Sequence, residues 1–389
     1  MNRGLTAALV LGLGLAATAG PTGSAAPGPL LWRKSVLDRA FRAEGAAVAD
    51  VNRDGRADVL AGNLWYEAPN WKPHEIRPAQ AFPAATGYSN CFLCFAADVN
   101  RDGWPDEIVV GFPGQTSAWF RNPGAGGGPW QAHPITDSAC NESPLLTDLT
   151  GDGVPELVTP HQESRMAYYS ILPGAQGGFR QHVIGEMGAP GCKRFSHGLG
   201  VGDLNRDGRA DILCADGFYS APERAGQRPW PFVITRISPD CAQMYVRDFD
   251  GDGDADVISS SAHRVGVWWH EQVPGPQGPV FRTHVIDDTF SQSHALMEAD
   301  LNGDGRPDYV TGKRVWAHGP GGDVNPNHPA MLCWYEWARD GSTVRWTRHV
   351  IDEDSGIGTG FCVADINNDR RPDVVTANKR GVFVFTQER

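Results

Sequence analysis

The sequence lacks the short motifs that mark several common enzyme classes. Its 389 residues contain no HExxH motif, no phosphate-binding loop and no nucleophile elbow, so hydrolase and kinase activities have no support. No stripe of Lys and Arg is present, which argues against a nucleic-acid partner. The one long apolar run, from Leu5 to Ala17, is too short to span a bilayer comfortably, so we expect no membrane insertion.

The first residues have the pattern of an export signal. Arg3 precedes the apolar run, and residues 17–19 (Ala-Thr-Ala) form a small-x-small cleavage site, although a cut near Ala26 also fits. We therefore interpret residues 1–19 as a signal peptide and residues 20–30 as a short linker. The sequence thus predicts a soluble protein that is secreted or periplasmic, and we expect a monomer.

A nine-residue acidic loop occurs seven times in the chain. The copies read DVNRDGRAD, DVNRDGWPD, DLTGDGVPE, DLNRDGRAD, DFDGDGDAD, DLNGDGRPD and DINNDRRPD. Positions 1, 3, 5 and 9 carry oxygen-bearing side chains, and six of the seven copies have Gly at position 6. The predicted metal ligands are Asp50, Asn52, Asp54, Asp58, Asp98, Asn100, Asp102, Asp106, Asp148, Thr150, Asp152, Glu156, Asp203, Asn205, Asp207, Asp211, Asp248, Asp250, Asp252, Asp256, Asp300, Asn302, Asp304, Asp308, Asp365, Asn367, Asp369 and Asp373.

This spacing is typical of a loop that wraps a hard cation. Alternate side chains point inward, a backbone carbonyl near position 7 adds an oxygen, and Gly supplies the sharp turn. Asp, Asn and Gly are also ordinary turn formers, but seven copies favour up to seven calcium ions. The loops hold many of the chain's carboxylates, so the net charge of −12 predicts no cationic partner. The fifth loop should bind tightest, and the third and seventh more weakly because they carry Thr150 with Glu156 and Arg370, respectively.

The eight cysteines of an expected exported chain suggest disulfides. Five of them lie just upstream of an acidic loop, in equivalent connections: Cys91, Cys94, Cys140, Cys192 and Cys241. We expect neighbouring connections to be bridged, for example Cys140 to Cys91 or Cys94, and Cys192 to Cys241. Cys91 and Cys94 also have the spacing of a redox pair or half a zinc site, but no second CxxC completes such a site.

The acidic loops recur about every 50 residues, which is the spacing of propeller blades. We predict an all-β fold over residues 31–389: a seven-bladed β-propeller of four-stranded antiparallel blades. Residues 31–38 resemble a fourth strand, whereas the last repeat stops after its third strand at 381–386. The N-terminal strand should therefore complete the C-terminal blade and close the ring.

Five repeats end in an aromatic-x-x-His-x-Ile pattern, and paired aromatic residues precede it. A position that repeats usually reports a structural role, so these histidines are interpreted as scaffold and the aromatic pairs as core between blades. The histidines are His74, His133, His182, His284 and His349.

The loops and four-strand repeats resemble the FG-GAP and VCBS-type repeats of secreted bacterial proteins, related to the propeller of integrin alpha chains. The resemblance covers residues 31 to 389. The phrase from His197 to Asp203 (HGLGVGD) and the WxxHxI strands are similar to the propeller part of aldos-2-ulose dehydratase, a sugar-dehydrating enzyme. Seven-bladed polysaccharide lyases share this architecture. The resemblance implies an activity on sugars, but the same fold serves many functions and does not by itself establish this one.

Strand order places candidate functional residues at the ring centre, on the face opposite the acidic loops. Six residues before each first loop Asp stand Glu44, Phe92, Glu142, His197, Ala242, His294 and Thr359. Connections between the second and third strands add His161, Asp216, His263 and an insertion, 313–331, with Arg314, His318 and His328. Long loops on a rigid scaffold often carry function. We expect His161 to neighbour His197, and His263 to neighbour His294.

Such histidines, with Lys193 and Arg194 nearby, suit two chemistries. They can ligate a transition metal at the channel mouth, or one can act as base in β-elimination from a uronate or keto-sugar while a cation stabilises the enolate. Channel-mouth polar residues can also simply hold water. The sequence favours a binding scaffold for a carbohydrate or protein ligand, without nucleic acid. The alternatives are a carbon–oxygen lyase acting on sugars, with His161, His197, His263 and His294 as catalytic candidates, and an adhesive protein with integrin-like contacts.

Overall fold

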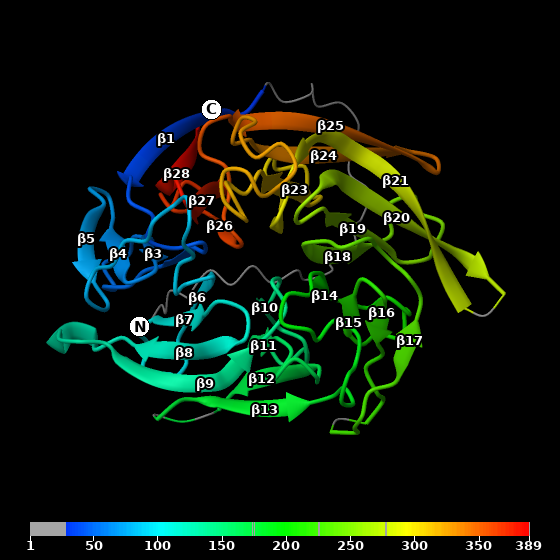
Figure 1. The fold of residues 1–389 in the computed structure, drawn as a ribbon, viewed down its shortest axis with the longest axis horizontal. Helices are drawn as coiled ribbons and strands as arrows, with labels where there is room; N and C mark the ends of the chain where they lie inside the picture. The colour runs from blue at the N-terminus through cyan, green and yellow to red at the C-terminus, as the bar shows by residue number, and fades with distance from the viewer. Residues whose placement is uncertain (1–28, 173, 175, 225, 277, 389) are drawn as a thin grey trace, which may run out of the picture.

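The computed structural model describes residues 29–388, apart from residues 173, 175, 225 and 277. The expected signal peptide and nearly all of the expected linker lie outside the described residues. The chain forms strands almost throughout, in successive groups of four arranged around a common axis (Figure 1). Among the described residues no helix is long or apolar enough to cross a membrane.

The first half of the chain forms three sheets of four strands. The strands that precede or build them are β1 (Leu31–Asp38), β2 (Ala47–Ala49), β3 (Asp58–Ala61), β4 (Leu64–Glu67), β5 (Lys72–Glu75), β6 (Leu93–Ala97), β7 (Asp106–Val110), β8 (Gln115–Arg121), β9 (Gln131–Ala139), β10 (Leu145–Thr147), β11 (Glu156–Val158), β12 (Ala167–Ile171) and β13 (Phe179–Val183). A short 3-10 helix, η1 (Gly124–Gly126), lies between β8 and β9. Each sheet pairs its strands in chain order, as β2–β5, β6–β9 and β10–β13.

The second half continues the same pattern. Its strands are β14 (Leu199–Gly202), β15 (Asp211–Cys214), β16 (Gly217–Tyr219), β17 (Phe232–Ile234), β18 (Gln243–Arg247), β19 (Asp256–Ser260), β20 (Val265–Gly275), β21 (Gly278–Ser291), β22 (Leu296–Ala299), β23 (Asp308–Gly312), β24 (Leu332–Asp340), β25 (Thr343–Asp352), β26 (Phe361–Ala364), β27 (Asp373–Asn378) and β28 (Gly381–Glu388). The second strand of each repeat is buried over its whole length, as in β27, because neighbouring blades cover both faces.

The N-terminal strand closes the ring as predicted. β1 pairs antiparallel with β28, from Leu31 opposite Glu388 to Asp38 opposite Val382, and the sheet order is β1-β28-β27-β26. In Figure 1 the blue N-terminal strand lies beside the red C-terminal strands. This pairing covers the sheet edge that β28 would otherwise expose.

The expectation of seven separate blades is corrected by the hydrogen bonding. Five sheets are separate four-stranded blades, whereas β14–β17 and β18–β21 form one eight-stranded sheet. The two halves join through parallel pairing of β14 with β18, with Gly200 opposite Met244. A Cβ on Gly200 would lie 2.6 Å from the Met244 carbonyl oxygen, so only glycine allows the two innermost strands to approach this closely.

The repeated histidines stack on aromatic side chains of the adjacent strand. Trp65, Trp119, Tyr168, Trp269 and Trp334 each stack on the repeat histidine, with ring centroids 4.1–4.5 Å apart. Three of these histidines also contact a glutamate at 2.7–3.1 Å. These contacts agree with the interpretation of the repeated position as scaffold.

The expected disulfides are not found, since all eight cysteines are free thiols. Cys192 and Cys241 pack into different hydrophobic clusters between blades, which explains why this pair does not meet. The Cys140 sulfur instead accepts a hydrogen bond from the Glu163 backbone N–H at 3.2 Å. Cys91 and Cys94 are buried in a third cluster.

Candidate functional site

The acidic loops share one backbone conformation that directs their side chains inward. Residues at positions 4 and 6 both have positive φ, as for Arg53 (59°) and Gly55 (88°) in the first loop. In that loop the backbone N–H groups of Asp54 and Gly55 donate to the two carboxylate oxygens of Asp50, at 2.9 and 3.0 Å. The same donation from positions 5 and 6 to position 1 recurs in five further loops.

The acid at position 9 is buried at the start of the second strand. In the first loop its carboxylate accepts hydrogen bonds from the backbone of Val51 and Ala68, at 3.1 and 2.8 Å. Burial raises the pKa of Asp58 to about 7, and repulsion from Asp54 and Asp50 adds to this effect. Each loop therefore holds several carboxylates close together, so that their negative charges repel one another. The lone pairs of these oxygens that accept no hydrogen bond are suited to a hard cation.

The fifth loop concentrates its carboxylates most. Oxygens of Asp248, Asp250 and Asp256 lie within 4.8 Å of one another. The other loops have Asn or Thr at position 3. The residues present thus fit calcium, with the densest donor set where the sequence predicts the tightest binding.

The second candidate site lies at the ring centre, at the opposite ends of the strands. Because the acidic loops join the first strand of each repeat to the second, the connections on either side of this strand pair fall on the other face. Glu142 precedes β10, His197 precedes β14, and His294 precedes β22, each by two or three residues. His263 follows β19 in the connection to β20.

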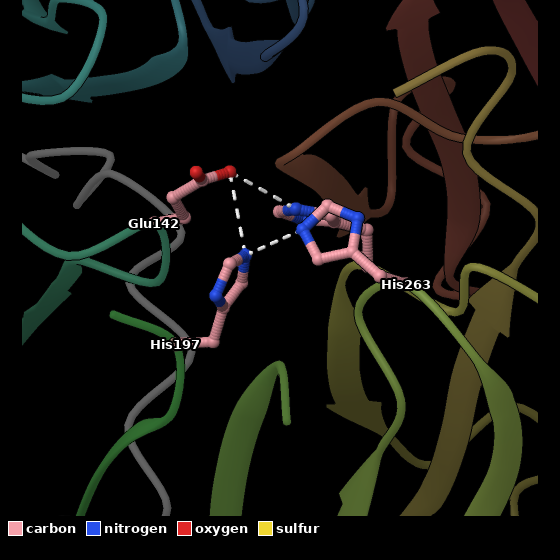
Figure 2. A group of neighbouring side chains, drawn as sticks. Glu142, His197 and His263 are labelled. Carbon is pink, nitrogen blue, oxygen red and sulfur yellow. Dashed lines mark hydrogen bonds and ion pairs between the residues drawn. The ribbon is translucent and has the colours of Figure 1, made fainter. Parts of the chain in front are cut away.

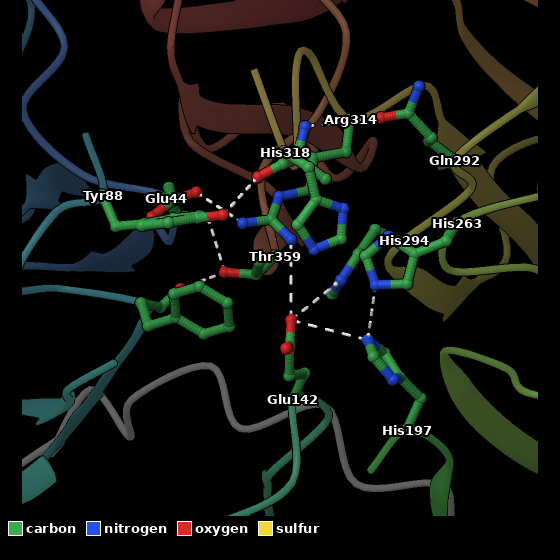
Figure 3. A network of polar contacts seen from close by, with 12 residues as sticks. Glu44, Tyr88, Glu142, His197, His263, Gln292, His294, Arg314, His318 and Thr359 are labelled. Carbon is green, nitrogen blue, oxygen red and sulfur yellow. Dashed lines mark hydrogen bonds and ion pairs between the residues drawn. The ribbon is translucent and has the colours of Figure 1, made fainter. Parts of the chain in front are cut away.

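Glu142, His197 and His263 point toward one another (Figure 2), and His294 joins them in the wider view (Figure 3). The Nε2 atoms of His197 and His263 are 2.9 Å apart, and Glu142 Oε2 lies 3.5 Å from His197 Nε2 and 3.1 Å from His294 Nε2. One ligand atom from each residue lies within 4.8 Å of the other three. Three imidazole nitrogens and a carboxylate oxygen that converge in this way form a donor set for a transition metal. We call these four residues the quartet.

Carboxylates stand behind two of the imidazoles. Asp240 lies 3.2 Å from Nδ1 of His197, and Asp323 lies 3.6 Å from Nδ1 of His263. Asp323 also contacts Nδ1 of His318 at 2.8 Å. A carboxylate behind a histidine orients the ring and raises its basicity, which is common around metal-binding histidines.

Charge and burial set the protonation of the quartet. Burial opposes protonation of His197, but Asp240 and Glu142 outweigh it and raise its pKa to about 9. Burial lowers the pKa of His263, and burial together with the Arg314 charge lowers that of His294 well below its usual range. Without a metal ion, His197 is therefore protonated and donates a hydrogen bond from Nε2 to the neutral His263. A metal ion that binds all three imidazoles displaces this proton.

Arg314 connects the quartet to the rest of the ring centre (Figure 3). Its guanidinium lies 2.7 Å from Glu44 and 3.6 Å from Glu142, and all three side chains are at most 8% exposed. Thr359 donates to the backbone oxygen of Glu44 at 3.3 Å. The Tyr88 hydroxyl donates to the Ala317 carbonyl at 2.7 Å.

The structure brings together three of the four predicted catalytic histidines. His161 lies outside the quartet, because its Nδ1 contacts Thr136 at 3.0 Å and its backbone bridges Ala139 and Arg165. The prediction that His161 contacts His197 is therefore wrong, and His263 is the histidine that contacts His197. Ala242 also stays outside the network, and its N–H donates to Ser260.

Sequence reasoning placed Glu142 at the channel mouth but did not assign it as a ligand. The sequence does contain a sign of this role: Glu142, His197 and His294 each stand six residues before the first Asp of an acidic loop, so they occupy equivalent positions in their repeats. Asp240 and Asp323 were not predicted, and no spacing in the sequence marks them.

Comparison with known families supports the repeat assignment. Residues 79–159 and 248–311 match the sequence model of the FG-GAP-like repeat, which covers less than half of the chain. The chain thus forms a β-propeller that carries FG-GAP-like repeats, an architecture suited to a binding scaffold. No curated protein sequence matches the chain, so the resemblance to aldos-2-ulose dehydratase gains no support.

Among solved structures, 230 chains match. One is a lectin from Agrocybe aegerita, described in terms of its specific recognition of non-reducing terminal N-acetylglucosamine; it is 17% identical, with 84% of this chain and 82% of that chain covered and a TM-score of 0.49. Another is BBS1N in complex with ARL6DN, soaked with mercury; it is 11% identical, with 92% and 97% covered and a TM-score of 0.49. At these scores, what the two proteins bind is not carried over to this chain.

Proposed function

We propose that this protein is an exported, calcium-stabilised β-propeller that acts as a binding scaffold for a carbohydrate or protein ligand. The ligand binds at the ring centre, opposite the acidic loops, and a divalent transition-metal ion held by the quartet takes part in binding. The observation that carries the proposal is the convergence of one ring nitrogen from each of three histidines and one carboxylate oxygen of Glu142 within 4.8 Å of one another. When bound, the ion supplies a Lewis-acidic attachment point for ligand oxygen atoms.

The chain's own residues prepare this site. Asp240 lies 3.2 Å from His197 Nδ1 and Asp323 lies 3.6 Å from His263 Nδ1, so each places a negative charge behind an imidazole. Arg314 lies 3.6 Å from the Glu142 oxygen that faces His197. Arg314 is itself paired with Glu44 at 2.7 Å, so Glu142 lies beside a guanidinium that is held in place. A preorganised set of ligands loses little conformational entropy when the ion binds.

A second candidate function is β-elimination from an acidic sugar. The observation that favours it is the position of Arg314, which lies near both the Tyr88 hydroxyl and the neutral His294 (Figure 3). His263 or His294 would take the proton α to the carboxylate, Arg314 would stabilise the enolate, and Tyr88 would protonate the leaving oxygen as the carbon–oxygen bond breaks. An unsaturated product that absorbs in the ultraviolet would distinguish this lyase from a scaffold.

Elemental analysis of protein purified without added metal or chelator tests the proposal. We expect several calcium ions and about one transition-metal ion per chain. His197→Ala and His294→Ala should remove the transition metal and leave calcium, whereas His161→Ala, on the same face but outside the quartet, should retain both. A wild-type protein without a transition metal would overturn the ring-centre proposal, and one without calcium would overturn the calcium assignment.

A further inference from the structure

A row of three aromatic side chains runs beside the quartet. The ring centroids of Tyr88 and Phe112 are 4.7 Å apart, and those of Phe112 and Phe195 are 5.7 Å apart. Phe195 is 53% exposed, which is unusual for so large an apolar side chain. Tyr88, Phe112 and Phe195 are called the aromatic row below.

The aromatic row is continuous with the proposed metal centre. Phe195 stands two residues before His197 in the connection to β14. The next residue, Ser196, accepts a hydrogen bond at its carbonyl from the Glu142 N–H at 2.9 Å. A ligand that touches Phe195 therefore also lies next to the connections that carry two quartet residues.

A buried ammonium group at the other end of the row has no carboxylate partner. Lys379 is 6% exposed, and its Nζ lies 4.7 Å from the centre of the Tyr88 ring and donates to the Trp316 carbonyl at 2.8 Å. Among the described residues it forms no ion pair within 4.0 Å, whereas nearby Arg314 is paired with Glu44. A buried charge without a counter-ion is costly, so an anionic ligand group would be favoured here.

We propose that the ring centre binds an oligosaccharide that carries carboxylate groups, such as a chain of uronic acids. This inference rests on the proposed function and names its ligand class. The apolar faces of sugar rings pack on the aromatic row, a carboxylate faces Lys379, and sugar oxygens approach the quartet. A protein partner fits less well, because Phe195 is a single exposed ring beside charged Arg194, whereas a stable protein interface buries about 800 Å² per partner.

Calorimetric titration with defined oligosaccharides tests the proposal. The probes are oligomers of galacturonate, alginate and hyaluronan, with methyl-esterified oligogalacturonate and cello-oligosaccharide as uncharged controls. We expect at least one acidic oligomer to bind, and the uncharged controls to bind at least about tenfold more weakly. Phe195→Ala and Lys379→Met should each weaken binding by about tenfold. Ile234→Ala, an 87% exposed apolar residue on β17, should leave binding unchanged.

The outcomes separate this inference from the proposed function. If the protein contains its transition metal but binds none of the acidic oligomers, the inference fails and the metal centre stands. If metal and binding are both absent, both proposals fail. Binding that is unchanged in Phe195→Ala would place the glycan elsewhere and overturn the inference, even if Lys379→Met does not fold. Melting temperatures of the variants verify that each one is folded.

Discussion

Asp240 holds its carboxylate 3.2 Å from Nδ1 of His197, on the side of the ring that faces away from the quartet. If His197 ligates a metal through Nε2, this contact fixes the ring and its tautomer. We therefore expect Asp240→Asn to weaken transition-metal affinity by about 10- to 100-fold. Competition with a chromophoric chelator, with Zn²⁺ as the probe, would measure the change.

The matched control for Asp240 is Asp137, whose carboxylate stands 3.8 Å from Nδ1 of His161, outside the quartet. Asp137→Asn should leave the affinity unchanged. Equal metal affinities of the Asp240→Asn variant and the wild type would show that Asp240 does not position a ligand. The metal-free variant should melt at a lower temperature than the wild type near pH 7, because it lacks the carboxylate that stabilises the His197 proton, and this difference should disappear above about pH 9.

Glu44 neutralises a guanidinium that has almost no access to water. Arg314 is 3% exposed and Glu44 1% exposed, with 2.7 Å between their charged atoms. Among the described residues, Glu44→Gln leaves Arg314 with a single carboxylate contact, 3.6 Å to Glu142, so we expect the free energy of unfolding to fall by about 3 kcal/mol. Urea unfolding would measure this change.

The control for this prediction is an exposed ion pair in the same part of the ring. Arg194 and Glu163 are 2.5 Å apart but 47% and 44% exposed, so Glu163→Gln should cost less than about 1 kcal/mol. If Glu44→Gln and Glu163→Gln lower the free energy of unfolding by the same amount, burial does not make the Glu44–Arg314 pair more important than an exposed pair.

Sequence periodicity predicts much of this molecule, because equivalent positions in a repeat occupy equivalent places in space. The shared register of Glu142, His197 and His294 therefore placed them at the ring centre. The contact between His263 and His197 joins residues from different repeats and different connections, so no periodic pattern marks it. The pairing of β14 with β18 requires glycine at position 200, because a side chain there would clash with the neighbouring strand. The sequence does not show which strand lies beside Gly200, so this pairing could not be predicted.

The seventh acidic loop contains a strained residue at position 6. Arg370 has φ of 69°, in the left-handed region where the other loops have glycine. Arg370→Gly removes this strain, although glycine also gains entropy in the unfolded chain, so we expect a net gain of about 0.5–1 kcal/mol in unfolding free energy. Thermal unfolding at saturating calcium would show the increase.

Replacing the glycine at position 6 of the sixth loop with arginine tests the same strain by introducing it. Gly305 has φ of 85° and open space where a Cβ would lie, so Gly305→Arg should lose stability through backbone strain alone. If Arg370→Gly lowers the melting temperature, the strain assignment is wrong.

The acidic loops should link calcium to folding. Metal that binds only the folded chain stabilises it, so excess chelator should lower the melting temperature. Asp250→Asn should reduce this calcium-dependent stabilisation, because it removes one of the three carboxylates that converge in the fifth loop. The exposed Asp288, outside the loops, supplies the control Asp288→Asn. Melting curves that chelator does not shift would disprove the link.

His270 should make folding sensitive to acid. Its ring is fully buried on β20 between Ser259 and Thr283, with contacts of 2.8 and 3.0 Å. Burial, with a smaller contribution from His284, lowers the pKa of His270 to about 3. Below pH 6.5 the unfolded chain binds a proton at this histidine that the folded chain does not bind. Stability is therefore complete above about pH 6.5 and falls as pH decreases toward 3.

The loss assigned to His270 is on the order of 4 kcal/mol over this range, with a slope of up to about 1.4 kcal/mol per pH unit. His270→Gln keeps a polar group between Ser259 and Thr283 but cannot bind the proton. Urea unfolding of both proteins at pH 6.5, 5.5 and 4.5 should therefore give a shallower slope for the variant, even if its stability at pH 6.5 is lower. Acid release of calcium affects both proteins equally. Equal slopes for the variant and the wild type would therefore mean that the pKa of His270 does not differ between the folded and the unfolded chain.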